Sequence, residues 1–368
     1  MMESDEVERP GGGGLSHRRA IVCLFAIWLC LVLSQLSPSF DMNPDSGRYV
    51  ALAQSIAAGR GYTLSGRFSR RYPPLFPVIL SAVTSPDRHD FRPEKLLVML
   101  TGLGAMIASY WLLSQRYQGR TLLTLAVLVA VSPAFLSHCV LLRSDMPFFF
   151  FTAVFLAATN HFWRARKPSW VMAPVLAVAL GAAALTRSAG MVFYVTGLAW
   201  LARLRLWRRD LRRCMVFGAV IIFIAFPPAM GWMAWVNSHR EGGTISYREW
   251  IQSGVLRGES PVSIKGLSVL VSRESRTLPT QVSNAARTVI SLGGGTTGQL
   301  WALILAPIGL LGLARRMRRP DPSDYSFCGY SVMVLLWPWP QGVRLLSLIH
   351  ISEPTRPLYI SYAVFCLK

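Results

Sequence analysis

Long apolar runs alternate with short polar segments through most of the chain. A helix needs roughly 17 to 25 mainly apolar residues to cross about 30 Å of hydrocarbon. The runs therefore predict membrane-spanning helices rather than the buried helices of a water-soluble core. The predicted spans are 20–36, 95–113, 122–142, 146–162, 170–185, 189–204, 215–236, 300–313 and 325–339, the last two being the shortest.

The first long polar segment follows the first span directly and reads FDMNPDSGRYVALAQSIAAGRGYTLSGRFSRRYPPLFP. Within it, Tyr49, Ala53 and Ile56 recur at helical spacing, and Gly59 and Gly61 follow as stop signals. The pattern predicts a short helix lying in the membrane interface. Because charged residues are few in this chain, a segment this rich in aspartate and arginine is a candidate for chemistry at the membrane surface.

The apolar stretch 73–84 is too short to span and carries Pro73, Pro74 and Pro77 near its start. If it lies in the interface, the basic clusters SHRR, QRYQGR, WRARK, RLRLWRRDLRR and ARRMRR all fall on one face of the membrane. Basic clusters mark the cytoplasmic face. The N-terminus is then cytoplasmic, and segments 37–93 and 237–299 are the large outer loops.

Composition agrees with this class. The chain has 368 residues, of which 52% are hydrophobic and 15% are charged, whereas a soluble domain carries about 25% charged residues. The net charge of +20 comes from clusters between apolar runs, which disfavours nucleic acid as a partner. Five of the six cysteines lie singly in apolar or nearly apolar runs and show no metal-binding spacing.

The domain organisation follows from these patterns. Residues 1–19, which include a run of four glycines, are expected to form a disordered cytoplasmic tail. The first span has no small-residue cleavage site before Ser39, so an uncleaved anchor is favoured over a signal peptide. The spans and outer loops of residues 20–344 are expected to form one transmembrane domain.

Asp45 is the first candidate for chemistry, with two interpretations. Aspartate near a helix N-terminus often caps the helix. Alternatively, an outward-facing carboxylate at the edge of a membrane cavity can act as a general base. Short outer turns place Asp145, Arg187 and Arg344 at the same predicted depth as Asp45. Ionisable residues at such positions usually face a cavity or a partner, because exposure to hydrocarbon is costly.

Three motifs carry a family resemblance. An Asp after the first span, followed by Tyr, an alanine-rich helix, G-x-G-Y and YPPL-F-P, resembles the first outer loop of GT-C glycosyltransferases. VSPAFLSHCVLLRSDMPFFFF resembles their stretch with a second acidic residue, and AALTRSAG resembles their turn with a basic residue. The ordered set covers residues 20–204. It implies an all-α fold, a polytopic transmembrane helical bundle of the GT-C type with interfacial helices in the first outer loop.

The resemblance also implies roles for individual residues. Asp45 matches the acid taken as catalytic base, and Asp145 matches the second catalytic acid. Arginine suits phosphate because its planar fork gives two parallel hydrogen bonds. For Arg71 and Arg187, contact with lipid headgroups is the alternative to substrate binding. The implied substrate-binding set is Arg48, Tyr49, Arg71, Tyr72, Arg187 and Arg344.

The implied activity is transfer of a sugar from a polyprenyl-phosphate carrier to a glycan, lipid or protein acceptor, with inversion at the sugar. The enzyme is expected in the bacterial inner membrane with its active site on the outer face. No cofactor is implied, since the lipid-linked sugar is a substrate. The first motif lacks the adjacent Glu of many relatives, which disfavours a metal ion without excluding a divalent one.

Two other classes remain as alternatives. A transporter or lipid flippase would use the outer arginines as an anion vestibule, but such proteins usually show repeated halves and charges near the midplane. A sensory protein would use 237–299 as a receptor domain, but this segment is short and glycine-rich.

Finally, SLIHISEPTRP resembles a translated sequencing adapter, so residues 345–368 are expected to be a non-native tail.

Overall fold

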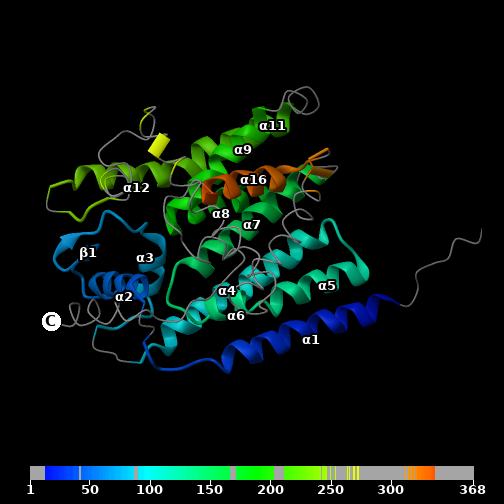
Figure 1. Cartoon of the computed structure of the whole chain (residues 1–368), viewed down its shortest axis with the longest axis horizontal. Coiled ribbons are helices and arrows are strands. Elements are labelled where there is room, and N and C mark those ends of the chain that lie inside the picture. Colours follow the sequence, from blue (N-terminus) through cyan, green and yellow to red (C-terminus); the bar gives the residue numbers. More distant parts are fainter. Residues whose placement is uncertain are drawn as a thin grey trace, which may run out of the picture.

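The computed structural model describes residues 13–40, 43–86, 90–165, 171–202, 211–241, 243–246 and 320–335, with isolated positions between 249 and 318. Its long helices lie side by side in a bundle, and the short elements of the first polar segment gather at one end of it (Figure 1). In chain order the elements are α1 (Gly13–Leu33), α2 (Pro44–Ala57), β1 (Thr63–Leu64), β2 (Arg67–Phe68), α3 (Leu75–Ser81), α4 (Arg92–Ser114), α5 (Gly119–Ala130), α6 (Pro133–His138), α7 (Asp145–Arg164), α8 (Met172–Thr186), η1 (Ser188–Met191), α9 (Val192–Ala202), α11 (Leu211–Ala219), η2 (Val220–Ala225), α12 (Phe226–Ser238) and α16 (Pro322–Leu335).

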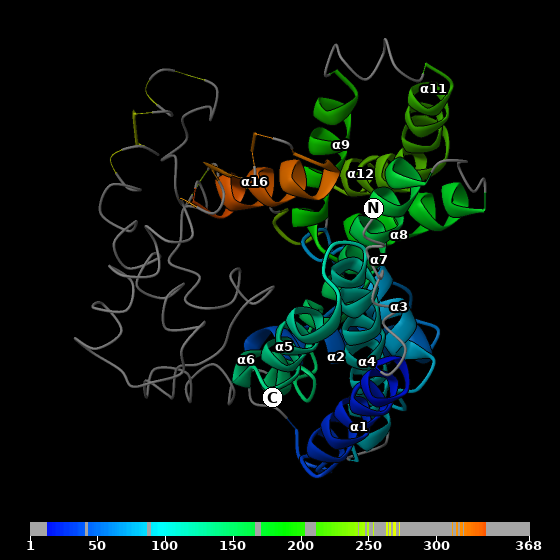
Figure 2. The ribbon, with the colours of Figure 1, turned by 90° about the vertical axis from the view of Figure 1, so that its right-hand side faces the viewer.

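Helices α7 and α8 occupy the middle of the bundle. In both views α1, α4 and α5 lie on one side of them, and α9, α11 and α16 lie on the other (Figures 1 and 2). Within the described residues, Arg92–Ser114 and Leu211–Ser238 are long and apolar enough to cross a membrane. Shorter apolar helices run from Gly119 to Ala130, from Met172 to Thr186 and from Ser188 to Ala202.

Most predicted spans correspond to helices, with shifted ends. Helix α1 starts at Gly13 and so includes residues that the sequence analysis assigned to the N-terminal tail. The predicted span 122–142 is wrong as one continuous helix. It breaks between α5 and α6, because Pro133 has no N–H to continue the helix and the Ser132 side chain caps the new one. The span 300–313, apart from the single position 311, and residues 336–368, including the suspected tail, lie outside the described residues.

The long helix that contains α11 and α12 is interrupted by a π-helical segment, η2. The interruption directly precedes Pro227 and Pro228, which cannot donate to the carbonyls one turn earlier. The Tyr194 hydroxyl, buried on α9, donates to the Ala225 carbonyl at 2.6 Å. A tertiary hydrogen bond therefore joins α9 to the last residue of the π-helical segment.

The buried apolar side chains form two clusters. One includes Trp28, Phe76 and Leu142 and joins the six helices α1, α2, α3, α4, α5 and α6. The other includes Phe155, Leu180, Phe193 and their neighbours and joins α7, α8, α9, α11 and η2. The first turn of α7 contributes to both, since Met146 belongs to the former and Phe148 to the latter. The start of α7 is thus held from two sides.

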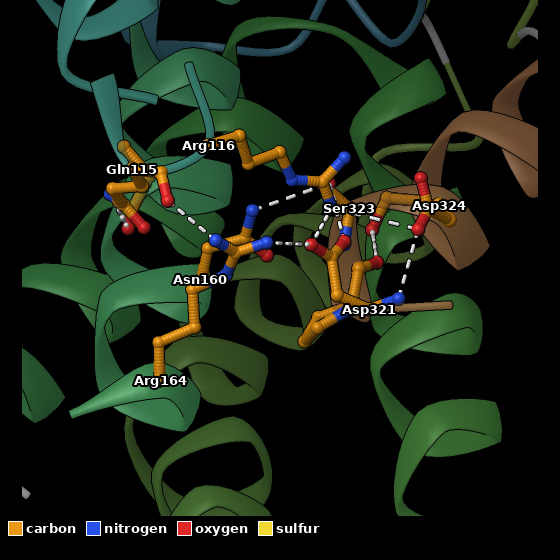
Figure 3. Close-up of polar contacts among 10 residues, drawn as sticks. Gln115, Arg116, Asn160, Arg164, Asp321, Ser323 and Asp324 are labelled. Carbon is orange, nitrogen blue, oxygen red and sulfur yellow. Dashed lines mark hydrogen bonds and ion pairs between the residues drawn. The ribbon is translucent and has the colours of Figure 1, made fainter. Parts of the chain in front are cut away.

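At the end of α7 opposite its first residue lies a network of ion pairs that we call the far-end network: Gln115, Arg116, Asn160, Arg164, Asp321, Ser323 and Asp324 (Figure 3). Arg116 pairs with Asp321 and, at 3.5 Å, with Asp324. Arg164 pairs with Asp321 at 3.0 Å, and Arg213 donates to the Trp163 carbonyl at 3.4 Å.

These contacts bring basic clusters from separate parts of the chain to one end of the bundle. Arg116, Arg164 and Arg213 come from three different clusters of the sequence, as the prediction of a shared face requires. Helix α3 has only seven residues, or about 10 Å, and cannot span. Its length agrees with the prediction that stretch 73–84 does not cross the membrane.

Candidate active site

The site occupies the end of the bundle opposite the far-end network, where α2 meets the first turn of α7. We call it the two-carboxylate site and define it by eight residues. They come from α2, the segment before α3, the start of α7 and the turn after α8: Asp45, Arg48, Tyr49, Arg71, Tyr72, Ser144, Asp145 and Arg187.

Helix α2 positions Asp45 without using it as the cap. The N-cap is Asn43, whose side-chain oxygen accepts from the Asp45 N–H at 3.0 Å, and Pro44 opens the helix with a favourable φ. The expectation that Asp45 itself caps the helix is therefore wrong. Gly59 and Gly61 follow the end of α2 and have φ of 72° and 73°, a conformation that favours glycine.

Around the Asp45 carboxylate lie a phenol and a guanidinium. The Tyr72 hydroxyl donates to Asp45 Oδ1 at 3.4 Å, and Arg48 Nη1 lies 3.9 Å from the same oxygen. Arg48 also donates to the Tyr72 hydroxyl at 2.8 Å. The Asp45 side chain is 34% exposed. Its carboxylate therefore remains accessible to an incoming hydroxyl group.

Two arginines flank the ring of Tyr72. The guanidinium carbons of Arg48 and Arg71 each lie 5.9 Å from the ring centre. Burial, followed by the nearby Asp45 charge, raises the pKa of Tyr72 to about 12, and the two arginines oppose that rise. Tyr72 is therefore a neutral donor at physiological pH.

Asp145, the first residue of α7, faces a different set of groups. Its Oδ1 pairs with Arg187 Nη1, and His138 Nδ1 lies 3.9 Å from Oδ2. Asp145 is buried, whereas Arg187 is 23% exposed and has its guanidinium carbon 5.9 Å from the Phe148 ring centre. The acid of this pair is thus buried, and its arginine is partly exposed.

Tyr49 connects the two carboxylates. Its ring packs edge-on against Tyr72 at 5.1 Å between ring centres, and its hydroxyl hydrogen-bonds Ser144 Oγ at 2.8 Å, directly before Asp145. Burial raises the Tyr49 pKa well above its ordinary value; the nearby Arg187 charge lowers it and Asp45 raises it. Tyr49 therefore interacts electrostatically with charged groups from both halves of the site.

The structure brings together seven of the eight residues that the sequence analysis selected, and Arg344 lies outside the described residues. Three arginines face two carboxylates, a balance of plus one that suits an anionic ligand. Sequence reasoning selected neither Ser144 nor His138, which is 2% exposed and lies against Asp145. Their only signal was proximity to Asp145 in sequence.

Beyond the site, Arg70 joins a later segment to the first long polar segment. It is buried and donates to Glu249 through both terminal nitrogens, at 3.2 and 2.9 Å, and to the Val236 carbonyl at 2.9 Å. The Thr244 N–H donates to the Phe68 carbonyl at 2.8 Å. Because Arg71 follows Arg70, this attachment also fixes the backbone that carries Arg71 and Tyr72.

The described part of the chain contains no metal-binding cluster. No three His, Cys, Asp or Glu side chains converge there closely enough to hold an ion.

Comparison with known proteins defines the fold class. A family model described as dolichyl-phosphate-mannose-protein mannosyltransferase matches residues 71–232, which contain Asp145 and Arg187. The chain has the GT-C fold, a polytopic transmembrane helical bundle, which confirms the all-α prediction.

The particular structures it resembles are two of ArnT from Cupriavidus metallidurans, one bound to undecaprenyl phosphate and one in the apo state. Each has a TM-score of 0.56 and 17% sequence identity, and the matches cover 94% and 96% of this chain. This chain spans 58% of the length of ArnT. The oligosaccharyltransferase AglB from Archaeoglobus fulgidus also matches, with a TM-score of 0.49 and 12% identity, over 96% of this chain and 54% of its own. No curated protein matches the chain.

Proposed function

We propose that this protein is a membrane glycosyltransferase that moves a sugar from a polyprenyl-phosphate carrier to an acceptor hydroxyl or amine. The observation that carries the proposal is the joining of the Asp45 and Asp145 groups, through Tyr49 and Ser144, at one end of a GT-C bundle. ArnT, with the same fold, has been solved with undecaprenyl phosphate bound, which supports a lipid-linked donor here.

Asp45 is the proposed general base. As the acceptor oxygen or nitrogen attacks the anomeric carbon, the bond from that carbon to the phosphate oxygen breaks, and the phosphate leaves with the electron pair. Asp45 takes the proton that the acceptor loses, a contribution of about two to four powers of ten in rate. Attack opposite the leaving group inverts the anomeric centre. The partial exposure of Asp45 suits access by an acceptor.

The arginines are the proposed phosphate ligands. The Arg187 side chain is 23% exposed, so it can receive a phosphate while the buried acid holds its position. Arg71 and Arg48, which lie against the Tyr72 ring, would bring further positive charge to the phosphate. Asp145 then acts by orienting Arg187, which sharpens the catalytic role that the resemblance implied. Charge stabilisation of this kind is worth about two to three powers of ten per group.

Sidedness completes the proposal. The far-end network gathers basic clusters, which are typical of the cytoplasmic face. The two-carboxylate site lies at the other end, on the outer face, with the lipid tail of the donor between helices and only its sugar in water. The test described next is designed to identify the sugar and the acceptor.

The test is transfer by membranes that contain this chain, with a panel of labelled undecaprenyl-phosphate sugars. We expect Asp45→Asn to lower the transfer rate by roughly a hundredfold or more. The matched control is Asp90→Asn, since Asp90 lies in the same predicted outer segment and pairs with the nearby Arg92 at 2.8 Å. Full transfer by Asp45→Asn contradicts the base assignment, and lipid movement without transfer supports a transporter instead.

A further inference from the structure

Ser144 occupies an unusual position at the start of α7. It is the N-cap residue of that helix, where a serine side chain commonly accepts from a backbone N–H of the first turn. Here the side chain makes no capping hydrogen bond. Its hydroxyl instead pairs with the Tyr49 hydroxyl at 2.8 Å, 95 positions away in the chain. Capping contributes about 1 kcal/mol, so the side chain has forgone a common local role.

Tyr49 is held firmly on its side of this bridge. Its ring lies edge-on between Tyr72 and Phe76, with centres 5.1 and 5.0 Å away, and it is 6% exposed. With its ring enclosed and its hydroxyl engaged by Ser144, Tyr49 has little surface left for a substrate. The substrate-binding role that the resemblance implied for Tyr49 does not fit this geometry.

The bridge joins the helices that carry the two acids. Asp45 lies one turn before Tyr49 on α2, and Asp145 follows Ser144 at the start of α7. A proton acceptor and a phosphate ligand on separate helices must keep their relative placement to within a fraction of an ångström. We propose that the Tyr49–Ser144 hydrogen bond is a positioning pair that sets Asp45 relative to the Asp145–Arg187 pair. This inference rests on the proposed function of the site.

The test is a double-mutant cycle with Tyr49→Phe, Ser144→Ala and the double variant. Each substitution removes one hydroxyl and leaves the ring or backbone in place. We expect each single variant to lower kcat roughly three- to tenfold, with KM for the undecaprenyl-phosphate sugar changed less than twofold. The double variant should lose no more than either single one, because the bond is broken only once.

Matched controls remove the same groups elsewhere. Tyr194→Phe deletes a buried phenol that bonds the Ala225 carbonyl, and Ser326→Ala deletes a buried serine hydroxyl on α16. Both should leave kcat within twofold of the wild type, whatever they do to the melting temperature. If the site variants lower only the melting temperature, or if their effects on kcat multiply, the positioning role is wrong.

A second readout separates this inference from the proposed function. Binding of undecaprenyl phosphate can be measured for all variants by native mass spectrometry, and the unfolding free energy can be measured over the same cycle. If the wild type transfers sugar and the cycle shows no coupling in kcat, the inference fails and the function stands. If the wild type transfers no sugar, the proposed function fails, and coupling in unfolding alone then assigns the pair a structural role.

Discussion

The two ends of α7 carry the same kinds of side chains, but the ion pairs around them differ. The helix begins at Asp145, paired with Arg187, and ends at Arg164, paired with Asp321, about 29 Å further along its axis. In the far-end network both Asp321 oxygens are engaged, by two arginines and by Ser323, and Asp321 and Arg116 are 15% and 13% exposed. In the two-carboxylate site Asp45, Arg48 and Arg187 are 34%, 36% and 23% exposed.

This difference separates a structural network from a binding site. An ion-pair network with buried members fixes helices against one another, and removing one member leaves uncompensated charge. A cluster whose carboxylate and guanidinium groups are partly exposed can receive a ligand. The residue types alone do not distinguish the two ends, since each consists of arginines and aspartates with a serine nearby. What distinguishes them is the exposure of the central acid, since Asp321 is 15% exposed and Asp45 is 34% exposed.

The largest expected effect comes from the same conservative substitution at both ends. Lysine keeps the positive charge but cannot form the two parallel bonds of arginine. Arg187→Lys should lower kcat/KM for sugar transfer roughly a hundredfold and leave unfolding nearly unchanged, because Asp145 keeps a counter-charge. Arg116→Lys should leave transfer within twofold. Transfer assays and thermal unfolding in detergent measure both. Equal activities of the two variants would contradict the distinction between the two ends.

A smaller effect is expected on stability at the far end. Asp321→Asn removes the negative charge shared by Arg116 and Arg164 in a mostly buried setting, so it should lower the unfolding free energy by about 2 kcal/mol. Transfer at permissive temperature should persist. The exposed pair of Asp90 with Arg92 provides the control, since Asp90→Asn should change the unfolding free energy by less than about 1 kcal/mol. Similar losses in both variants would show that the far-end network adds no more than a surface pair.

The sequence predicted the far end and the site to different degrees. Apolar spacing located the helices, and the shared side of the basic clusters followed from span parity, because hydrocarbon thickness and loop charge are properties of linear segments. Motif order selected Asp45, Asp145 and Arg187. The Tyr49–Ser144 bridge could not be predicted, since it joins positions 95 residues apart through a serine that resembles an ordinary cap. Nor did any pattern link Arg70 to Glu249.

The smallest expected effect concerns that Arg70–Glu249 contact, which is neither closed like the far end nor open like the site. Glu249 is 43% exposed, yet the Ser246 N–H and then Arg70 lower its pKa from 4.5 to about 2. A lowered folded-state pKa stabilises the attachment above about pH 4.5, and this contribution is lost as the pH falls toward 2.

Hydrogen exchange at the Thr244 amide, which donates to the Phe68 carbonyl, reports this attachment. Once corrected for intrinsic exchange, it should accelerate roughly two- to fivefold between pH 5 and pH 3, a small change because solvent screens the pair. Glu249→Gln should exchange faster at both pH values and lose most of the pH dependence, whereas Asp90→Asn should behave as the wild type. An unchanged pH response in Glu249→Gln would assign the effect to another carboxylate and leave Arg70 held mainly by the backbone carbonyls of Val236 and Thr244.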